Sequence, residues 1–183
     1  MLEETIAKIR DGEIDVITPA TEVGNSLMGI PSFEVPDFSE LLSEEKAMVA
    51  KLKNAFLMVA GKAVQTYGME LESHQQLILA AAEVMIEVYM AESAILKAEK
   101  IAKLTSEKAA ECQIAMAKLN LFNAVEKSAS MGKEAILYFS EGDEQRMMLM
   151  GLKRFTKYVN NPNPIALRKI VAAKVIEENK YCF

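Results

Sequence analysis

Apolar residues recur every three or four positions along most of this chain, which is the spacing of helices that bury one face. In the first long segment, residues 43–68, the apolar face consists of Met48, Leu52, Ala55, Phe56, Val59 and Ala63. The second, residues 72–103, has its main stripe at Leu77, Ala81, Val84, Val88, Ala91 and Ile95, widened by Ile78, Met85 and Tyr89. The pattern predicts two long helices, and the second is apolar enough to be expected at the centre of a bundle.

Three further helices are predicted, over residues 106–139, 143–159 and 165–179. The predicted buried face of the first consists of Ala115, Leu119, Phe122, Val125, Ala129 and Ile136. Ser43 and Asp143 each precede a helix-forming segment and are expected to cap its N-terminus, and the helix over residues 106–139 is expected to start near Ser106. The sequence NPNP at 161–164 ends one helix, and Pro164 suits the first turn of the next.

No segment shows the long polar-apolar alternation of a strand, and the connections between the long helices are short. The predicted fold is therefore all-α, an up-down bundle of four to five helices formed by residues 46–183. Residues 1–45 differ, because they contain several turn-forming glycines and prolines. We expect them to form an N-terminal arm or linker with one or two short helices, at residues 2–10 and 19–28.

Charge is divided unevenly between these two parts. Residues 1–45 hold eleven acidic and two basic side chains, and residues 46–183 hold fifteen acidic and nineteen basic ones, which leaves the chain at −5. Eight of the bases lie within residues 146–180, against two acids. This basic end could contact the acidic arm, an anionic membrane surface or an acidic partner. Contact with the arm needs no further component and is the preferred interpretation.

Composition argues against several classes of function. The pI is near 5.1 and the chain has no basic-aromatic stretch, so nucleic acid is not an expected partner. The most apolar run, residues 77–96, is interrupted by Glu83, Glu87 and Glu92, so a transmembrane span is not expected. The N-terminal residues carry acids where a secretory signal carries bases, and a cytoplasmic location is predicted.

Few side chains suggest a reaction. Glu83 and Glu87 share a helical face, but di-iron bundles also need Glu-x-x-His on two helices. His74 is the single histidine, and Leu71 rather than an acid stands three residues before it. We therefore predict a solvated polar stripe for the glutamates and an exposed or capping position for His74.

The cysteines and glycines are expected to have structural roles. Cys112 and Cys182 lie 70 residues apart, which favours neither a disulfide scaffold nor a zinc site, and Cys112 is expected in or beside the core. No glycine-rich phosphate-binding motif is present. Gly61, Gly132 and Gly151 are expected at bends or where helices approach closely.

The chain contains twelve methionines, of which Met147, Met148 and Met150 form a cluster. Methionine fills irregular gaps in cores and also suits adaptable binding surfaces. Core filling is the preferred interpretation here, with a groove for a lipid or a partner as the alternative. In total, the residues assign no catalytic, cofactor-binding or metal-binding position.

Three stretches of the chain are characteristic when taken together. They are VITPATEVGNSLMGIPSF (16–33), LILAAAEVMIEVYMAESAILKAEK (77–100) and EGDEQRMMLMGLKRFTKYVNNPNPIALRKIVAAKVIEENKYCF (141–183). In this order they resemble the C-terminal extension of large bacterial acyl-CoA dehydrogenases, the group similar to mitochondrial very-long-chain acyl-CoA dehydrogenase. The resemblance covers residues 14–183, and the ending is its most specific part.

The resemblance implies that a catalytic body precedes this region in the parent enzyme and holds the FAD, the acyl-CoA cleft and the glutamate base. No position here matches those motifs, so no catalytic or FAD-binding residue is carried over. The chain by itself is then expected to be non-catalytic, and its parent a flavin oxidoreductase of fatty-acid β-oxidation.

Its implied role is assembly, packing on the dehydrogenase body or association with a surface. Family members with the extension tend to be homodimers, and in the mitochondrial relatives part of it is implicated in membrane association. The alternative is a freestanding helical bundle that binds a protein partner or an apolar ligand.

Overall fold

The structure, a computed structural model, describes residue 15 and residues 17–28 and 38–180. Within these ranges the chain forms six α-helices, one 3-10 helix and no strand, so the all-α prediction is confirmed. The elements are α2 (Ile17–Met28), α3 (Ser43–Tyr67), the 3-10 helix η1 (Gly68–Ser73), α4 (Gln75–Leu104), α5 (Glu111–Phe139), α6 (Gly142–Phe155) and α7 (Pro164–Glu178). The helix predicted over residues 2–10 lies outside the described residues.

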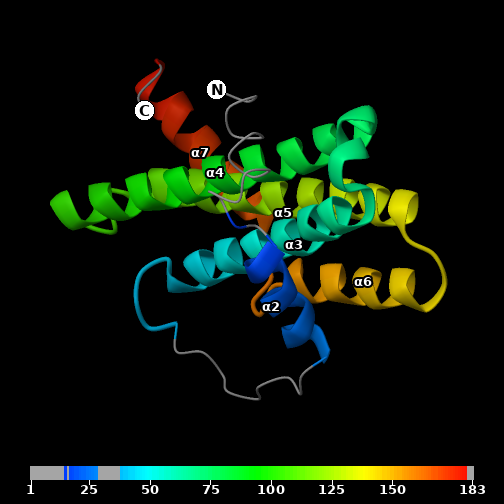
Figure 1. The fold of residues 1–183 in the computed structure, drawn as a ribbon. Coiled ribbons are helices and arrows are strands. Elements are labelled where there is room, and N and C mark those ends of the chain that lie inside the picture. The colour runs from blue at the N-terminus through cyan, green and yellow to red at the C-terminus, as the bar shows by residue number, and fades with distance from the viewer. Residues whose placement is uncertain (1–14, 16, 29–37, 181–183) are drawn as a thin grey trace.

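The long helices run alternately up and down (Figure 1). α4 and α5 form the most extensive helix pair, and α3 packs against both of them. α6 returns along α3 and α5, while α2 packs on α3 and α7 packs on α5. The predicted up-down bundle is therefore confirmed, with α2 and α7 attached to its outside.

Two groups of buried side chains form the core. The first lies between α3, α4 and α5 and includes Leu52, Val88, Ala91, Ile95 and Leu121. The second joins α2, α3, α5, α6 and the first turns of α4, and includes Val23, Met58, Val59, Ile136 and Leu152. Most buried residues of α3 and α4 fall on the predicted apolar faces, because helical periodicity already places them on one side. The face predicted for α5 is only partly right: Ala115, Val125 and Ile136 are buried, whereas Leu119, Phe122 and Ala129 are half-buried.

The predicted position of the second long helix is only partly right. Leu77 and Val84 are buried as predicted, but Met85 is 51% and Tyr89 is 72% exposed. α4 packs on α3 and α5 and leaves one side uncovered, so it does not lie at the centre of the bundle. Two neighbouring helices cover only part of a helix circumference, and an apolar run cannot indicate which part stays outside.

Both predicted N-caps are wrong. Ser43 donates its hydroxyl to the Glu40 carbonyl at 2.8 Å and caps no backbone N–H of α3. Leu42 occupies the capping position instead, in a left-handed conformation with φ 60°. α6 begins at Gly142, whose φ of +60° favours glycine, so Asp143 lies inside the first turn.

The helix predicted to start near Ser106 begins later, at Glu111, and Ser106 caps a turn that precedes it. Its Oγ accepts the backbone N–H of Ala109 at 3.1 Å, and the helix begins after this turn. α7 begins as predicted with Pro164, and Asn163 caps it by accepting the Ala166 N–H at 3.1 Å.

Two helix boundaries also differ from the prediction. α4 begins later, at Gln75, because η1 occupies the preceding residues. α6 ends earlier, at Phe155, because the chain then turns towards α3. There Glu44 accepts the backbone N–H of Asn160 at 2.7 Å, which a continued helix would not permit.

Asp15 caps α2, so this helix begins two residues before its predicted range of 19–28. Its carboxylate accepts the N–H groups of Thr18 and Ile17 at 3.0 Å each. Hydrogen bonds from Thr18 are the main cause that lowers the pKa of Asp15. α2 buries Val23 in the second core group. The short helix is confirmed, and the division into arm and bundle stays a prediction.

Candidate functional site

The two carboxylates that suggested a metal are bound to one lysine. Lys127 of α5 pairs with Glu83 and with Glu87 of α4, and its Nζ lies 2.9 Å from Glu87 Oε1. The hydrogen bonds that Lys127 donates to Glu83 and Glu87 raise the pKa of Lys127 to about 12. Instead of a solvated stripe, these glutamates form a bridge that holds α4 to α5. The described residues contain no group of three or more His, Cys, Asp or Glu side chains that could hold a metal ion.

His74 takes the capping position of α4, although its side chain makes no capping hydrogen bond. Its ring stacks on Tyr67 with centroids 3.8 Å apart, and its Nδ1 lies 2.8 Å from Tyr138 Oη. These three rings close the end of the bundle where η1 connects α3 to α4. Because the ring is held by aromatic neighbours rather than by a carboxylate, this cluster packs the bundle end.

Of the three glycines expected at bends or close helix contacts, Gly132 and Gly151 occupy such contacts, and Gly61 is buried within α3. A Cβ atom on Gly132 would lie 2.9 Å from Leu152 Cδ1, and one on Gly151 would lie 2.7 Å from a leucine methyl of α2. Both positions therefore let neighbouring helices approach α5 and α6. Cys112 is 7% exposed and belongs to the core as predicted, whereas Cys182 lies outside the described residues.

Methionine serves both of the roles considered for it. Three methionines are buried in the core: Met48, Met58 and Met148. Five are exposed: Met69, Met85, Met90, Met147 and Met150. Core filling therefore accounts for only part of the methionines, and the rest contribute apolar surface.

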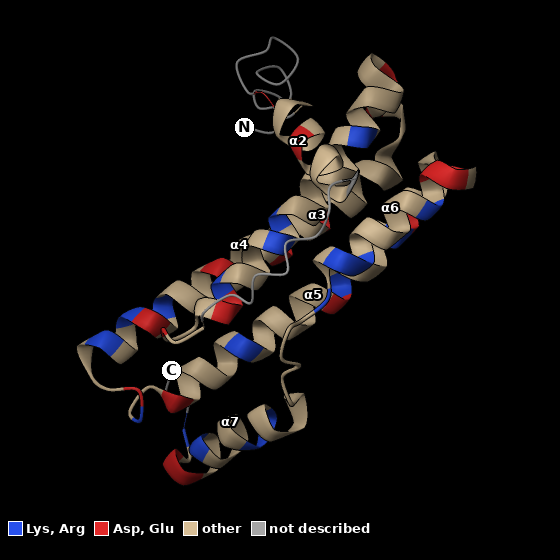
Figure 2. Cartoon of the chain, turned by 90° about the horizontal axis from the view of Figure 1, so that it is seen from below, with Lys and Arg blue, Asp and Glu red and all other residues tan. Residues whose placement is uncertain are grey.

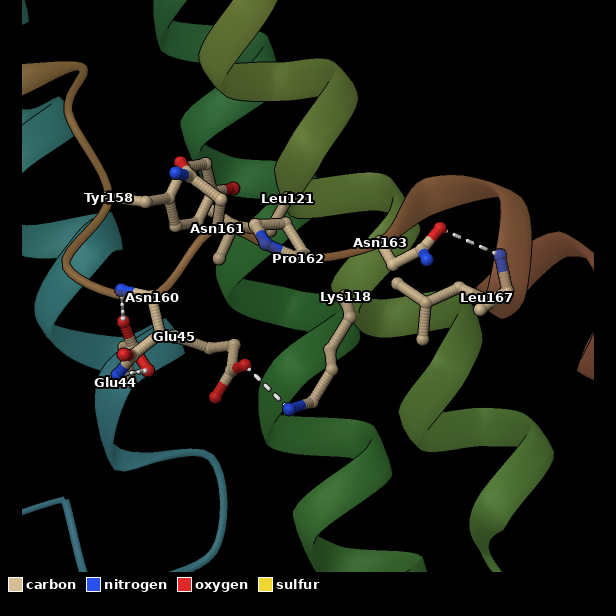
Figure 3. A pocket seen from close by; sticks show the side chains of 11 residues that line it. Glu44, Glu45, Lys118, Leu121, Tyr158, Asn160, Asn161, Pro162, Asn163 and Leu167 are labelled. Atoms are coloured by element: carbon tan, nitrogen blue, oxygen red, sulfur yellow. Dashed lines mark hydrogen bonds and ion pairs between the residues drawn. The ribbon is translucent and has the colours of Figure 1, made fainter.

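A hollow of about 280 Å³ lies where the α6–α7 connection meets α3 and α5 (Figure 3). Glu44 accepts hydrogen bonds from the backbone and side-chain nitrogens of Asn160, at 2.7 and 3.0 Å. Glu45 pairs with Lys118 of α5 at 2.8 Å. Tyr158 Oη is buried without a hydrogen-bond partner among the described residues, and burial raises the pKa of this hydroxyl.

This hollow is better suited to fixing the chain than to a reaction. Glu45 and Lys118 already bind one another, and Glu44 already binds Asn160 of the α6–α7 connection. The described lining residues contain no histidine, serine or cysteine and therefore no Ser–His or Cys–His pair, and the raised pKa of the Tyr158 hydroxyl disfavours its ionised, nucleophilic form. The sequence indicated only that NPNP ends a helix, since an anchor joining residues over a hundred positions apart leaves no local pattern.

The basic end does not pair with the acidic arm in the described part of the chain. There the bases of residues 146–180 form ion pairs only with acids of the same segment or just before it. An open hollow of about 620 Å³ is lined by Lys51, Met150, Lys153, Arg154, Lys157, Tyr158 and Val159. Figure 2 shows further basic positions along α7. Six of the eleven acids of the arm lie outside the described residues, so the preferred interpretation of a contact between the basic end and the arm stays a prediction.

Exposed apolar side chains gather most densely on α4. Leu79, Ile86, Tyr89, Met90 and Leu96, which we call the α4 outer face, are each between 48 and 72% exposed. They lie on the side turned away from the buried stripe that packs on α3 and α5. The apolar run was evident in the sequence, but its periodicity did not predict this exposure. Neither α4 nor another helix of the described ranges is long and apolar enough to cross a membrane.

These features define an all-helical domain whose ion pairs join its own helices and whose apolar surface is concentrated on α4. The family described as Acyl-CoA dehydrogenase, C-terminal domain, matches residues 51–154. This match covers more than half of the chain and runs from α3 to the end of α6. The chain therefore belongs to the acyl-CoA dehydrogenase C-terminal domain family, as the resemblance predicted.

Two relatives support this assignment over nearly the whole chain. A probable acyl-CoA dehydrogenase of Bacillus subtilis (strain 168) is 32% identical over 177 residues, which is 96% of this chain and 29% of that protein. The crystal structure of an acyl-CoA dehydrogenase complexed with FAD from Bacillus anthracis matches with a TM-score of 0.88 and 29% identity. That match covers 99% of this chain and 30% of the other. The chain thus spans about three tenths of the length of each relative.

Proposed function

We propose that this chain is the non-catalytic C-terminal domain of an FAD-dependent acyl-CoA dehydrogenase of fatty-acid β-oxidation. In this proposal the domain packs on the dehydrogenase body and supports its assembly, and the enzyme is cytoplasmic. The support comes from family membership together with the short share of each relative that the chain covers. The reaction itself is assigned to the rest of the enzyme.

The proposal rests mainly on one observation: the polar side chains that could do chemistry bind other parts of the fold instead. The candidate chemical groups (Glu83, Glu87, His74, Glu44 and Glu45) are each engaged in contacts between elements of the fold. What the described surface offers instead is an apolar helix face. A domain whose charges hold it together and whose apolar face is exposed is suited to contact another protein surface.

The described residues do not fit the FAD that the family implies. A dinucleotide usually places its phosphates on a glycine-rich turn at a helix N-terminus. No glycine lines the hollows of about 280, 620 and 650 Å³, although the second has basic side chains. We therefore place the flavin of the parent enzyme outside the described part of this chain and derive no flavin chemistry from its residues.

The first test is the size of the native protein. An antibody raised against this chain is used to detect and capture the protein from its source cells. A product several times heavier than 20.3 kDa that carries flavin absorbance would support the proposal. A flavin-free product of 20.3 kDa would contradict it and would favour the freestanding bundle that binds a partner or an apolar ligand.

The non-catalytic role has its own test. The 183-residue chain is mixed with FAD, an acyl-CoA and an artificial electron acceptor, and acceptor reduction is followed by absorbance. We expect no reduction above the rate without protein, while the captured native enzyme serves as the positive control. Acyl-CoA-dependent reduction by the 183-residue chain alone would refute the assignment of catalysis to the rest of the enzyme.

A further inference from the structure

The glutamates of α4 explain why its outer face carries no acid. Glu83 and Glu87 pair with Lys127 of α5. On the opposite flank, Glu92 pairs with Lys53 at 2.6 Å and Glu99 pairs with Lys46 at 2.7 Å. Both of these lysines belong to α3. All four glutamates of the helix are thus drawn towards its neighbours. The side between the two flanks is left with apolar and uncharged residues from Leu79 to Leu96.

The size of this face matches that of one side of a protein interface. If each of its five side chains exposes on the order of 100 Å², the face presents about 500 Å², within the range of the largest apolar patch on a typical monomer. A specific interface buries about 600 Å² or more on each partner, so the face with its surroundings is large enough for a lasting contact. An uncharged face of this size is unfavourable in water.

The face is also held in a fixed position. Beneath it, Val84, Val88 and Ile95 are each at most 7% exposed and belong to the core between α3, α4 and α5. The flanking ion pairs add contacts to both neighbours. A preorganised surface of this kind loses little conformational entropy when another surface covers it.

We propose that the α4 outer face is the surface by which this domain docks on the catalytic part of the dehydrogenase, an inference that rests on the proposed function. The choice of partner follows from chain length: about seven tenths of each relative lies outside the region that this chain matches. The family match includes the whole of α4, so the face is part of the domain that recurs in these enzymes. The partner surface is expected to be apolar opposite the five residues of the face, which offer no charge to pair with a buried one. An acid is expected there only beside the exposed Lys97, which follows Leu96 at the end of the face.

Photo-cross-linking in the native, full-length protein tests this contact. A photoreactive residue, p-benzoylphenylalanine, replaces Tyr89 in one variant and Ile176 of α7 in the control. Ile176 is 78% exposed and lies on another helix, so it matches Tyr89 in exposure but not in position. After irradiation, the cross-linked peptides are identified by mass spectrometry.

We expect position 89 to cross-link to peptides of the catalytic part, and position 176 to do so at least about tenfold less. Cross-links from position 89 to a second copy of this domain would overturn the proposal in favour of self-association. The absence of any protein cross-link at position 89 would also overturn it, because the face would then be open to water.

A second measurement does not depend on the photoreactive residue. Ile86→Lys in the full-length protein places a charge at the centre of the face, where Ile86 is 50% exposed. We expect limited proteolysis to release the domain about tenfold faster than in wild type, and Ile176→Lys to change the rate less than twofold. Equal rates for Ile86→Lys and wild type would overturn the proposal.

The size and flavin content of the wild-type sample are measured beforehand. A flavin-free protein of 20.3 kDa would refute the proposed function itself. A long, flavin-bearing protein without the position-89 cross-links would refute only the docking face.

Discussion

Two buried serines, Ser128 within α5 and Ser140 at its end, provide a test of the packing. Substitution by alanine should raise the free energy of unfolding at Ser128 and lower it at Ser140. Ser128 is 1% exposed, and its Oγ has no hydrogen-bond partner among the described residues. The gap beside it is about 10 Å³ and is otherwise lined by apolar residues. A water needs at least about 10–15 Å³ and two or more polar partners, so water cannot satisfy this hydroxyl.

Ser128→Ala should therefore raise the free energy of unfolding. A buried hydroxyl without a partner costs about 1–3 kcal/mol, and alanine is also the better helix former by about 0.5 kcal/mol. Removing the oxygen enlarges the gap, which costs about 0.3 kcal/mol at roughly 24 cal/mol per Å³. We expect a net stabilisation of about 1–3 kcal/mol, or a rise in Tm of about 2–12 °C for a chain of this length.

Ser140→Ala is the matched control. Ser140 is 4% exposed and donates its hydroxyl to the Ile136 carbonyl at 2.6 Å. The Ser140 backbone N–H also donates to this carbonyl, at 3.1 Å, so the substitution removes one of two hydrogen bonds. We expect a loss of about 0.5–1.5 kcal/mol.

Urea unfolding followed by circular dichroism measures both variants against the wild-type 183-residue chain. The m-value should be unchanged, since neither substitution alters the surface exposed on unfolding appreciably. The reasoning is refuted if Ser128→Ala destabilises the chain as much as Ser140→Ala does. The Ser128 hydroxyl would then have a partner that the packing described here lacks.

Two further predictions concern the attachment of α2 and the bridge between α4 and α5. Val23→Ala should lower the free energy of unfolding by about 1–2 kcal/mol, because Val23 is 7% exposed in the core group that joins α2 to α3 and α6. An unchanged urea midpoint would mean that α2 is not packed there. Lys127 has its pKa raised from 10.5 to about 12 by Glu83 and Glu87, so its contribution to stability is complete below pH 10.5 and is lost as pH rises through about 12. Lys127→Met should make the loss of stability between pH 10 and 12 less steep than in wild type, and the same slope in a pH-dependent unfolding series would contradict the bridge.

Much of the fold could be read from local spacing. The stripe that contains Leu77, Val88 and Ile95 is buried as predicted, and Pro164 opens α7 as predicted. Such features depend on residues three or four apart, or on the backbone preferences of a single residue. The family resemblance was also accessible, since it rests on residues along nearly the whole chain.

The interactions that bring distant residues together could not be read in this way. Glu83 and Glu87 were expected to face solvent, but Lys127, some forty positions away, holds them against α5. Ser43 and Asp143 had the residue types of helix caps, yet the backbone conformations of Leu42 and Gly142 set those helix starts differently. In each case the outcome depends on which segment the chain meets after folding.

The sequence by itself determined that this protein is a helical bundle, which residues could enter its core and to which family it belongs. Only the tertiary structure decided which side of α4 is covered. An almost continuous apolar run satisfies the hydrophobic effect whichever side turns inward, because burial energy depends on area and not on direction. Packing against α3 and α5, and the ion pairs that draw the glutamates to these neighbours, decide the orientation and leave the α4 outer face exposed.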